Sequence, residues 1–359
     1  MKNYNPKFKN KFYVFILGGL LTAGFFVWQF GSQNFEISKN TASNLSGADK
    51  NESILNKNGE KSIISGSLSG LDCENKNRRP VAVMLAGDPH TRPLSGIGEA
   101  DIVVEMPVIT GDINRFMAVY QCDVPKEIGS ARSSRHDFIP LATAFDAIFV
   151  HWGGSHFALE KLDKGIIDNI DALKNNFGAF WRKEGISAPD NGFTSASRLS
   201  QAIQKFGYRQ ESEFEGYWRT ADKAASEKKG VLEIGYPGVY AVRYEYFPNS
   251  NAYLRFKNGK PEIDKNNNTQ VRVKNIVVMI AEMRQIEGQY NDVDVEGDGR
   301  VVVYKNGEEI KGKWKKDAKN IANKLYFYDK DGNEILLAPG SIWIEIVSPE
   351  TEVFWKIFD

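Results

Sequence analysis

Four short apolar runs lie between residues 81 and 150: Val81-Ala-Val-Met-Leu85, Ile102-Val-Val-Glu-Met-Pro-Val108, Phe116-Met-Ala-Val-Tyr120 and Ala147-Ile-Phe-Val150. Each has the length of a β-strand, and their continuous apolar character indicates strands that are covered on both faces. Helical patterns occur between and after them, at 134–145, 157–173 and 195–206. Strands with intervening helices predict an α/β domain built on a mixed sheet.

Beyond about residue 225 the helical patterns become rare and strand patterns dominate. Six strands are expected there, at 240–247, 252–256, 271–281, 300–304, 325–328 and 342–347. Asn-Gly at 306–307 and Asp-Gly at 331–332 are typical hairpin turns. The sequence therefore predicts an α/β domain over residues 78–225 and a smaller, hairpin-rich β domain over residues 226–359.

The amino-terminal region carries a long uncharged run. Residues 12–30 read FYVFILGGLLTAGFFVWQF, and four lysines but no acid precede them. A helix of this length spans about 28 Å, close to the roughly 30 Å hydrocarbon core of a bilayer. By the positive-inside rule, residues 1–11 form a cytoplasmic tail, residues 12–30 a single transmembrane anchor, and the remaining chain is extracytoplasmic. The alternative is a secretory signal cleaved near Thr22-Ala23-Gly24.

Residues 31–77 are rich in Ser, Asn, Lys and Gly and predict a flexible stalk. The only two cysteines of the sequence, Cys73 and Cys122, both follow the expected anchor. In an oxidising exterior they are expected to form one disulfide, which is worth about 4 kcal/mol in the chain-entropy model. Two buried free thiols are the alternative.

The charge of the chain argues against a nucleic-acid partner. Its 359 residues carry 46 Lys+Arg and 46 Asp+Glu, so without the four lysines of the tail the balance is 42 against 46, or −4. The surplus of basic residues that displaces counterions from a nucleic acid is absent. With 42% apolar residues the chain can bury one or two cores, which excludes disorder throughout.

Several short signatures occur in an order that is more specific than any one of them. They are Arg79-Pro-Val-Ala-Val-Met, Arg92-Pro-Leu-Ser-Gly96, Ala100-Asp-Ile-Val-Val-Glu105, Arg115-Phe-Met-Ala-Val-Tyr, Ile128-Gly-Ser-Ala-Arg-Ser-Ser-Arg135 and Asp146-Ala-Ile-Phe-Val-His-Trp-Gly-Gly-Ser155. Together with segments 307–314 and 331–347, they resemble the YerB-like family, a two-part domain of unknown function first named from a Gram-positive lipoprotein. The resemblance covers about residues 78 to 357. It implies an envelope-facing protein and no established chemistry.

No metal or cofactor is expected. All four histidines lie between residues 90 and 156, yet none of their pairs has the spacing of a metal site. The acidic run at 292–299 is similar to the start of a calcium loop, but Val303 stands at position twelve, where a bidentate Glu is required.

His151 and Ser155 are candidate ligand-binding residues. His151 ends an apolar strand directly before Trp152-Gly-Gly-Ser155 and an expected helix, the place where open α/β sheets commonly bind ligands. Alternatively, a backbone carbonyl satisfies the buried His151, and Ser155 caps the helix.

A second set of candidates comprises Arg115, Arg132 and Arg135. Arg132 and Arg135 are three residues apart and share one face if they open a helix, and guanidinium groups bind carboxylate or phosphate bidentately. These features suit an anion. The alternative is that the arginines pair with Asp101 and Glu105, because an unpaired charge in or beside an apolar strand is costly.

Asp101 and Glu105 could instead serve catalysis. Their even spacing places both on one face of a strand, about 13 Å apart. A glycosidase pair needs roughly 5 to 9.5 Å, so Asp88 or Asp112 would have to act as the partner. No catalytic residue is therefore assigned.

The sequence favours a membrane-anchored, extracytoplasmic cell-envelope protein. We expect Arg115, Arg132, Arg135 and His151 to line a cleft at strand ends that binds an anionic envelope or cell-wall component. A cell-wall glycan hydrolase or transferase that uses acidic residues is one alternative, and a purely structural or protein-interaction module is another. The bilayer, contacted through residues 12–30, and the anionic component are the expected partners.

Overall fold

The computed structural model describes residues 53–55, 61–64, 67–109 and 113–358. The predicted tail and anchor lie outside the described residues, as do residues 31–52 of the predicted stalk. Among the helices that are described, none is long and apolar enough to cross a membrane. The α-helices of the described chain are α1 (Phe138–Ala144), α2 (His156–Asp163) and α3 (Ala196–Phe206).

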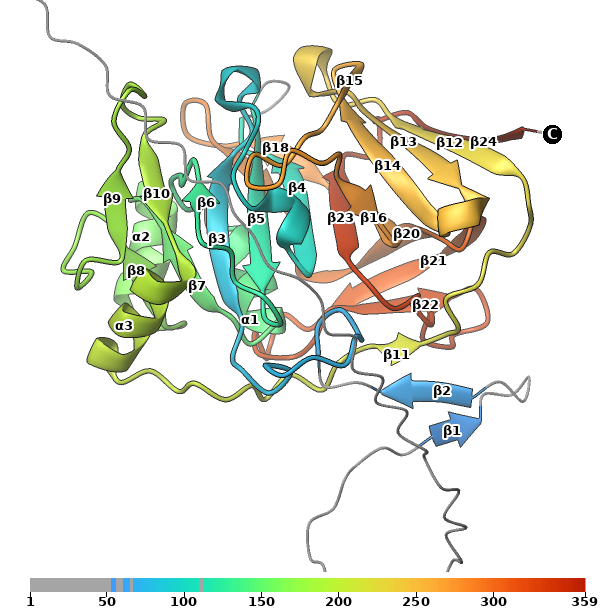
Figure 1. The fold of residues 1–359 in the computed structure, drawn as a ribbon, viewed down its shortest axis with the longest axis horizontal. Helices are drawn as coiled ribbons and strands as arrows, with labels where there is room; N and C mark the ends of the chain where they lie inside the picture. Colours follow the sequence, from blue (N-terminus) through green and yellow to red (C-terminus); the bar gives the residue numbers. More distant parts are fainter. Residues whose placement is uncertain (1–52, 56–60, 65–66, 110–112, 359) are drawn as a thin grey trace, which may run out of the picture. The chain divides into compact units, whose positions relative to one another are not determined.

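A ten-stranded sheet forms the centre of the fold (Figure 1). Its order is β22 (Tyr326–Asp329), β21 (Glu308–Lys316), β20 (Gly297–Lys305), β17 (Asn275–Ile280), β23 (Ile342–Val347), β4 (Ile102–Pro107), β5 (Asn114–Tyr120), β3 (Val81–Ala86), β7 (Ile148–His151) and β8 (Asn169–Asp171). Strand β5 runs antiparallel between β4 and β3, while β17, β23, β4, β3, β7 and β8 all run in the same direction. The carboxyl ends of these six strands therefore meet at one edge of the sheet.

Smaller sheets complete the fold. The second sheet contains β15 (Lys260–Pro261), β14 (Ala252–Lys257), β13 (Val242–Phe247), β12 (Lys229–Ile234) and β24 (Val353–Phe358), with β16 (Arg272–Val273) paired to β14. The others are β6 (Ile128–Gly129), β10 (Gly192–Thr194) and β9 (Phe180–Arg182); β1 (Ser53–Leu55), β2 (Lys61–Ile64) and β11 (Trp218–Arg219); and β18 (Met283–Gln285) with β19 (Asn291–Val293). Single 3₁₀ turns lie at Pro89–Thr91, Ile97–Glu99, Gly238–Tyr240 and Pro248–Ser250.

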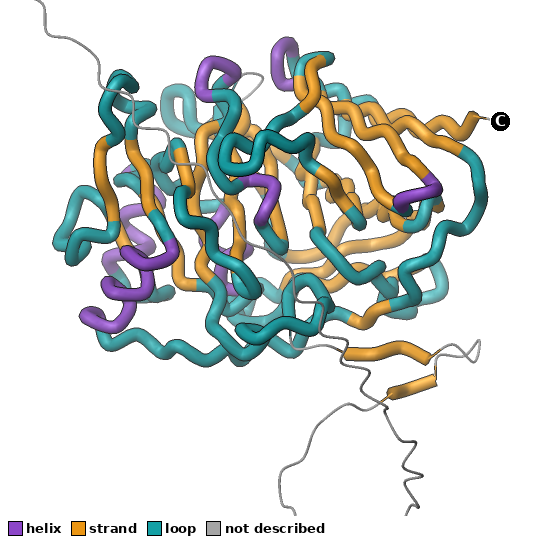
Figure 2. The backbone as a smooth tube through the Cα atoms, in the orientation of Figure 1, coloured by secondary structure: helices purple, strands orange, loops and turns teal. Residues whose placement is uncertain are grey.

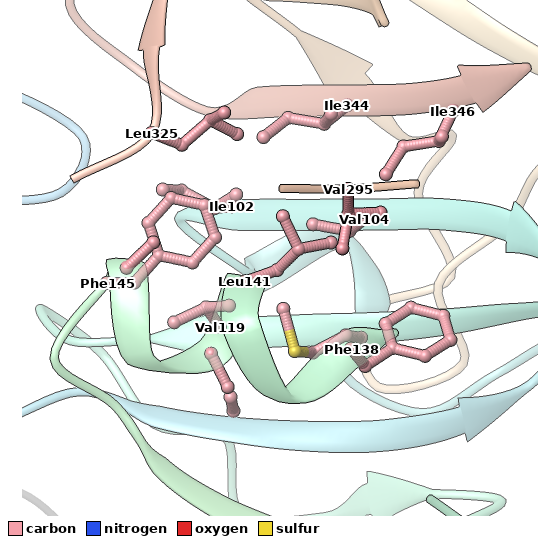
Figure 3. Packing of buried hydrophobic residues seen from close by; sticks show 14 of the residues in the cluster. Ile102, Val104, Val119, Phe138, Leu141, Phe145, Val295, Leu325, Ile344 and Ile346 are labelled. Carbon is pink, nitrogen blue, oxygen red and sulfur yellow. The ribbon is translucent and has the colours of Figure 1, made fainter. Parts of the chain in front are cut away.

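Both faces of the large sheet are buried along β3, β4, β5, β7, β17 and β23, as the continuous apolar runs predict. Alternate residues point to opposite sides: Ala82 and Val104 join a core with α1 and α2, whereas Val83 and Val103 join a core with α3 and the second sheet. Figure 3 shows the first core, where Phe138 and Leu141 of α1 and its C-cap residue Phe145 pack near residues of both halves of the chain.

The two halves of the chain share the large sheet. Strand β23, which follows the predicted boundary between residues 225 and 226, pairs in parallel with β4, which precedes it. Both strands belong to the ten-stranded sheet. The folded part also begins earlier than the predicted boundary at residue 78, because Leu68 is fully buried. The predicted Cys73–Cys122 disulfide is present and ties this early segment to Cys122, two residues beyond the end of β5.

The predicted mixed sheet with helices is present, but strands far outweigh helices in the described chain (Figure 2). Helix α1 begins later than predicted because Ser134 is held in a bridge to Gly154. Helix α2 ends near Gly165, which has φ of +70°, and residues 169–171 form β8 where a helix was predicted. Only α3 has the predicted extent, with Ser195 as its N-cap.

Candidate anion-binding site

The three candidate arginines lie at the carboxyl edge of the large sheet. Arg115 is near the start of β5, opposite Ala86 at the end of β3 and Met106 near the end of β4. Arg132 and Arg135 lie on the segment that crosses this edge before α1. The Arg132 amide donates to the Met84 carbonyl at 2.9 Å. Sheet topology thus brings together residues from separate signatures of the sequence.

Glycine permits the close packing of backbone at this edge. A Cβ on Gly87 would lie 1.8 Å from the Asn114 carbonyl oxygen, so only glycine lets the chain leave β3 beside β5. A Cβ on Gly154 would lie 2.2 Å from the Ser134 hydroxyl. The Ser134 hydroxyl donates to the Gly153 carbonyl at 3.1 Å, and this hydrogen bond together with the close approach of Gly154 holds the segment that carries Arg132 and Arg135.

In the described part of the chain, two of the three arginines donate hydrogen bonds only to uncharged backbone carbonyls, although the charges of Asp88 and Asp137 act on them from further away. Arg115 donates from Nη1 to the Ser133 carbonyl at 2.9 Å, and Arg135 donates from Nη1 to the Ser134 carbonyl at 2.9 Å. The Arg135 guanidinium also lies 5.5 Å from the centre of the Tyr290 ring. Among the described residues, no carboxylate lies within 4 Å of either guanidinium. The sequence left open that these arginines pair with Asp101 and Glu105. The structure does not contain these pairs, because Asp101 and Glu105 have other partners.

Arg132 differs because it has acidic partners. It forms an ion pair with Asp190, and its Nη2 lies 3.6 Å from Asp88 Oδ2. Asp190 also lies 2.9 Å from His90 Nε2. Arg132 is therefore neutralised by Asp190, with Asp88 nearby, whereas Arg115 and Arg135 have no ion pair among the described residues.

The cluster concentrates positive charge in a buried place. Arg115 is only 8% exposed, and burial, together with the charges of Arg135 and Arg132, lowers its pKa to about 9. The Nε atoms of all three arginines are buried and have no hydrogen-bond partner in the described part of the chain. Buried donors without acceptors are costly, so an oxyanion that accepted from them would be stabilising.

His151 and Ser155 lie near the same edge but make other contacts. The His151 ring is buried, with Nδ1 2.9 Å from the Gly153 carbonyl and Nε2 3.2 Å from Asn169 Oδ1. Burial lowers the pKa of His151, which favours the neutral ring. The Ser155 hydroxyl caps α2 by accepting from the Ala158 amide at 3.2 Å. Their observed contacts are those of the structural alternatives.

Asp101 and Glu105 are held in two separate places. Asp101 accepts from the amides of Gln121 at 2.7 Å and Cys122 at 3.2 Å, at the opposite end of β4 from the arginines. Burial raises the pKa of Asp101. Glu105 is fully buried between the two larger sheets, where it forms ion pairs with Arg255 and Lys257.

Glu105 belongs to a buried ionic network that the sequence reasoning missed; its members are Glu105, Glu345, Glu262, Arg255 and Lys257. Burial favours a neutral Glu105, but Lys257 and Arg255 outweigh it and hold its pKa below the ordinary value. Burial and the Glu105 charge raise the pKa of Glu345 to about 7. A signal was available, since Arg255 and Glu345 interrupt otherwise apolar strands and such charges require partners.

A cavity of about 440 Å³ adjoins this network. Arg92, Lys257 and Glu262 line it together with prolines and the exposed Val239. Arg92 Nε lies 2.9 Å from Glu262 Oε1. Pro89, from the loop that also carries Asp88, forms part of the wall. The cavity and the arginine cluster thus share one loop.

The fold and the site define a class: a two-part domain in which both halves build one sheet, with a cluster of three arginines at the carboxyl edge of that sheet. Sequence profiles agree with the two parts. The profile for the N-terminal domain of DUF3048, a protein family of unknown function, matches residues 68–209, and the profile for the C-terminal domain matches residues 232–344. The chain belongs to this family.

A related sequence and a solved structure that match this chain both carry the name YerB. The chain is 33% identical over 291 residues to the Bacillus subtilis (strain 168) protein named "Putative lipoprotein YerB", a match that covers 79% of this chain and 86% of the relative. The crystal structure of YerB protein from Bacillus subtilis matches with a TM-score of 0.70 and 31% identity. That match covers 80% of this chain and 98% of the solved chain. The resemblance to the YerB-like family is therefore confirmed.

Proposed function

We propose that this protein is a membrane-anchored, extracytoplasmic protein that binds an anionic cell-envelope ligand through Arg115, Arg132 and Arg135. The location is supported by the lipoprotein name of the relative and by the apolar run at residues 12–30. The Cys73–Cys122 disulfide is in keeping with an oxidising compartment.

One observation carries the binding proposal. Arg115 and Arg135 are close enough for their charges to interact, and no described carboxylate pairs with either of them. Protein interiors normally pair such charges, because an isolated buried cation is strongly unfavourable. A bound carboxylate or phosphate group would supply the missing negative charge and accept from the free Nε donors.

Glycan hydrolysis by Asp101 and Glu105 has less support. Each of the two carboxyl groups is buried and already accepts from protein donors. A general acid or base must reach the substrate. In the described part of the chain, neither carboxyl group contacts Arg115, Arg132 or Arg135.

Binding can be tested by calorimetry on the purified full-length protein. The probes are inorganic phosphate and a cell-wall stem peptide with free carboxylates. We expect millimolar or tighter binding of at least one probe, and a loss of tenfold or more in Arg115→Met and Arg135→Gln. Arg243→Met is the matched control, because Arg243 is a half-exposed arginine paired with Glu245. Equal binding by all variants, or none by the wild type at 10 mM probe, would contradict the proposal.

Location can be tested separately. Protease added to intact cells should remove the folded part of the chain that begins near residue 67. Full protection, under conditions that digest a known surface protein, would contradict an extracytoplasmic location without bearing on the binding site.

A further inference from the structure

Three potential metal ligands lie close together beside α1. His136 and Asp137 precede the helix, and Asp292 comes from β19. Their ligand atoms all lie within 4.8 Å of one another. His136 Nε2 is 2.9 Å from Asp292 Oδ1 and 3.1 Å from Asp137 Oδ1. One nitrogen and two oxygens thus converge on a small volume.

These residues line a cavity of about 110 Å³. Asp294 and Glu296, from the segment that follows β19, lie on its wall and add two further carboxylates. The volume is sufficient for an ion with one or more waters. The cavity is therefore bordered by more oxygen ligands than the three that already converge.

The buried groups at this cavity are not fully satisfied by one another. His136 is 7% exposed, and its Nδ1 has no hydrogen-bond partner in the described part of the chain. Its Nε2 faces two carboxylates but carries at most one hydrogen to donate. A cation bound to Nε2 and to one oxygen of each carboxylate would remove this mismatch between one donor and two acceptors.

Four cations lie near these carboxylates, and one of them is Lys316, whose charge interacts with Glu296. Lys161 of α2 lines the cavity, and Arg284 forms ion pairs with Asp292 and Asp294. Arg135 is the fourth nearby cation, and its charge acts on His136. Arg284 is more than half exposed, so it can move aside at little cost. Four carboxylates and four cations thus surround the cavity, and a bound metal ion would take the place of Arg284 as the partner of Asp292.

We propose that His136, Asp137 and Asp292 bind one divalent transition-metal ion, with Asp294 or Glu296 and water completing the coordination. Imidazole with carboxylates suits Zn²⁺ or Mn²⁺, whereas Ca²⁺ prefers oxygen ligands alone. The acidic run at 292–299 thus contributes its first residue to a site that depends on a distant histidine. This proposal does not rest on the anion-binding function.

Metal binding can be measured on chelator-treated full-length protein. Titration with Mn²⁺ is followed by the loss of the free-ion electron paramagnetic resonance signal, and Zn²⁺ by competition with a chromophoric chelator. We expect one equivalent to bind at micromolar to sub-millimolar metal and at least tenfold weaker binding in His136→Gln and Asp137→Asn. Asp163→Asn is the control, because Asp163 is an exposed α2 carboxylate paired with Lys174.

Circular dichroism of each variant, with no metal added, separates loss of ligands from loss of fold. A folded Asp137→Asn variant that binds as tightly as the wild type would overturn the proposal. No saturable binding of Mn²⁺ or Zn²⁺ by the wild type at 1 mM would also overturn it, as would binding of Ca²⁺ in preference to both.

Discussion

Two ionic groups begin at neighbouring residues of β5 and are balanced in different ways. Asn114 donates to Glu105 at 2.8 Å and so joins the buried network, in which Arg255 and Lys257 face Glu105, Glu262 and Glu345. The next residue, Arg115, belongs to the arginine cluster and forms no ion pair with a carboxylate among the described residues. Compensation inside the protein marks a structural network, whereas uncompensated charge is what a binding site for the opposite charge requires.

The largest effect is expected when the network loses its central cation. Arg255→Met would leave Glu105 with Lys257 and Glu262 with Arg92, and it would remove the one cation that lies within 4 Å of Glu345 among the described residues. Breaking a buried ion pair from one side typically costs about 3–5 kcal/mol. Denaturant unfolding should therefore show a lower midpoint with little change in slope.

Arg243→Met is the control for this measurement. Arg243 lies on the adjacent strand β13, is 37% exposed and pairs with Glu245 at 3.0 Å. Exposed pairs contribute about 0–1 kcal/mol, so the control should be nearly neutral. Equal effects of the two substitutions would show that the buried network is not a distinct structural unit.

The pH dependence of stability tests the network next. The pKa of Glu345 is raised to about 7 in the folded protein, against 4.5 for an ordinary Glu. Between these two values the folded chain holds a proton that the unfolded chain has lost, so stability falls as pH rises, by up to about 3 kcal/mol.

Glu345→Gln removes the carboxyl group that takes up this proton, so the free energy of unfolding should change less with pH between about pH 4.5 and 7. Asp137, whose pKa is also raised to about 7, adds a slope of the same sign to both proteins, and this slope cancels in the difference. Parallel profiles for wild type and variant would contradict the raised pKa of Glu345.

Local sequence patterns predict much of the sheet. The apolar run at residues 102–108 corresponds to β4, and the run at 342–347 corresponds to β23. Strand β21 was missed, because Glu308–Lys316 is dominated by charged residues and only Trp314 and Lys316 are buried in it. The parallel pairing of β23 with β4 joins residues about 240 positions apart, and no local pattern encodes it.

The same limit applies to the candidate site, where local patterns indicate which residues lie at strand ends but not which distant residues contact them. Strand-end reasoning predicts that Arg115, Arg132 and Arg135 lie near one edge, and the structure places them there. The partners of Glu105 could not be inferred, because Arg255 and Lys257 follow about 150 residues later on another sheet. The same holds for His136 and Asp292, which are separated by 156 residues.

The arginine cluster should respond to substitution in the opposite direction from the network. Arg115→Met removes a buried cation that lacks a carboxylate partner and keeps an apolar side chain of similar length. We expect it to leave stability unchanged or to raise it by roughly 1 kcal/mol in the absence of ligand. A loss above about 2 kcal/mol in denaturant unfolding would show that the protein itself compensates Arg115.

The smallest effect concerns the one arginine that is already paired. Asp190 neutralises Arg132, so an incoming anion must compete with it. Asp190→Asn keeps the size of the side chain and removes its charge, and we expect inorganic phosphate to bind a few-fold more tightly, a gain below about 1 kcal/mol. Asp163→Asn is the control, because it removes an equal charge from the exposed pair with Lys174. Weaker binding in Asp190→Asn than in this control would mean that Asp190 positions Arg132 for the ligand and does not compete with it.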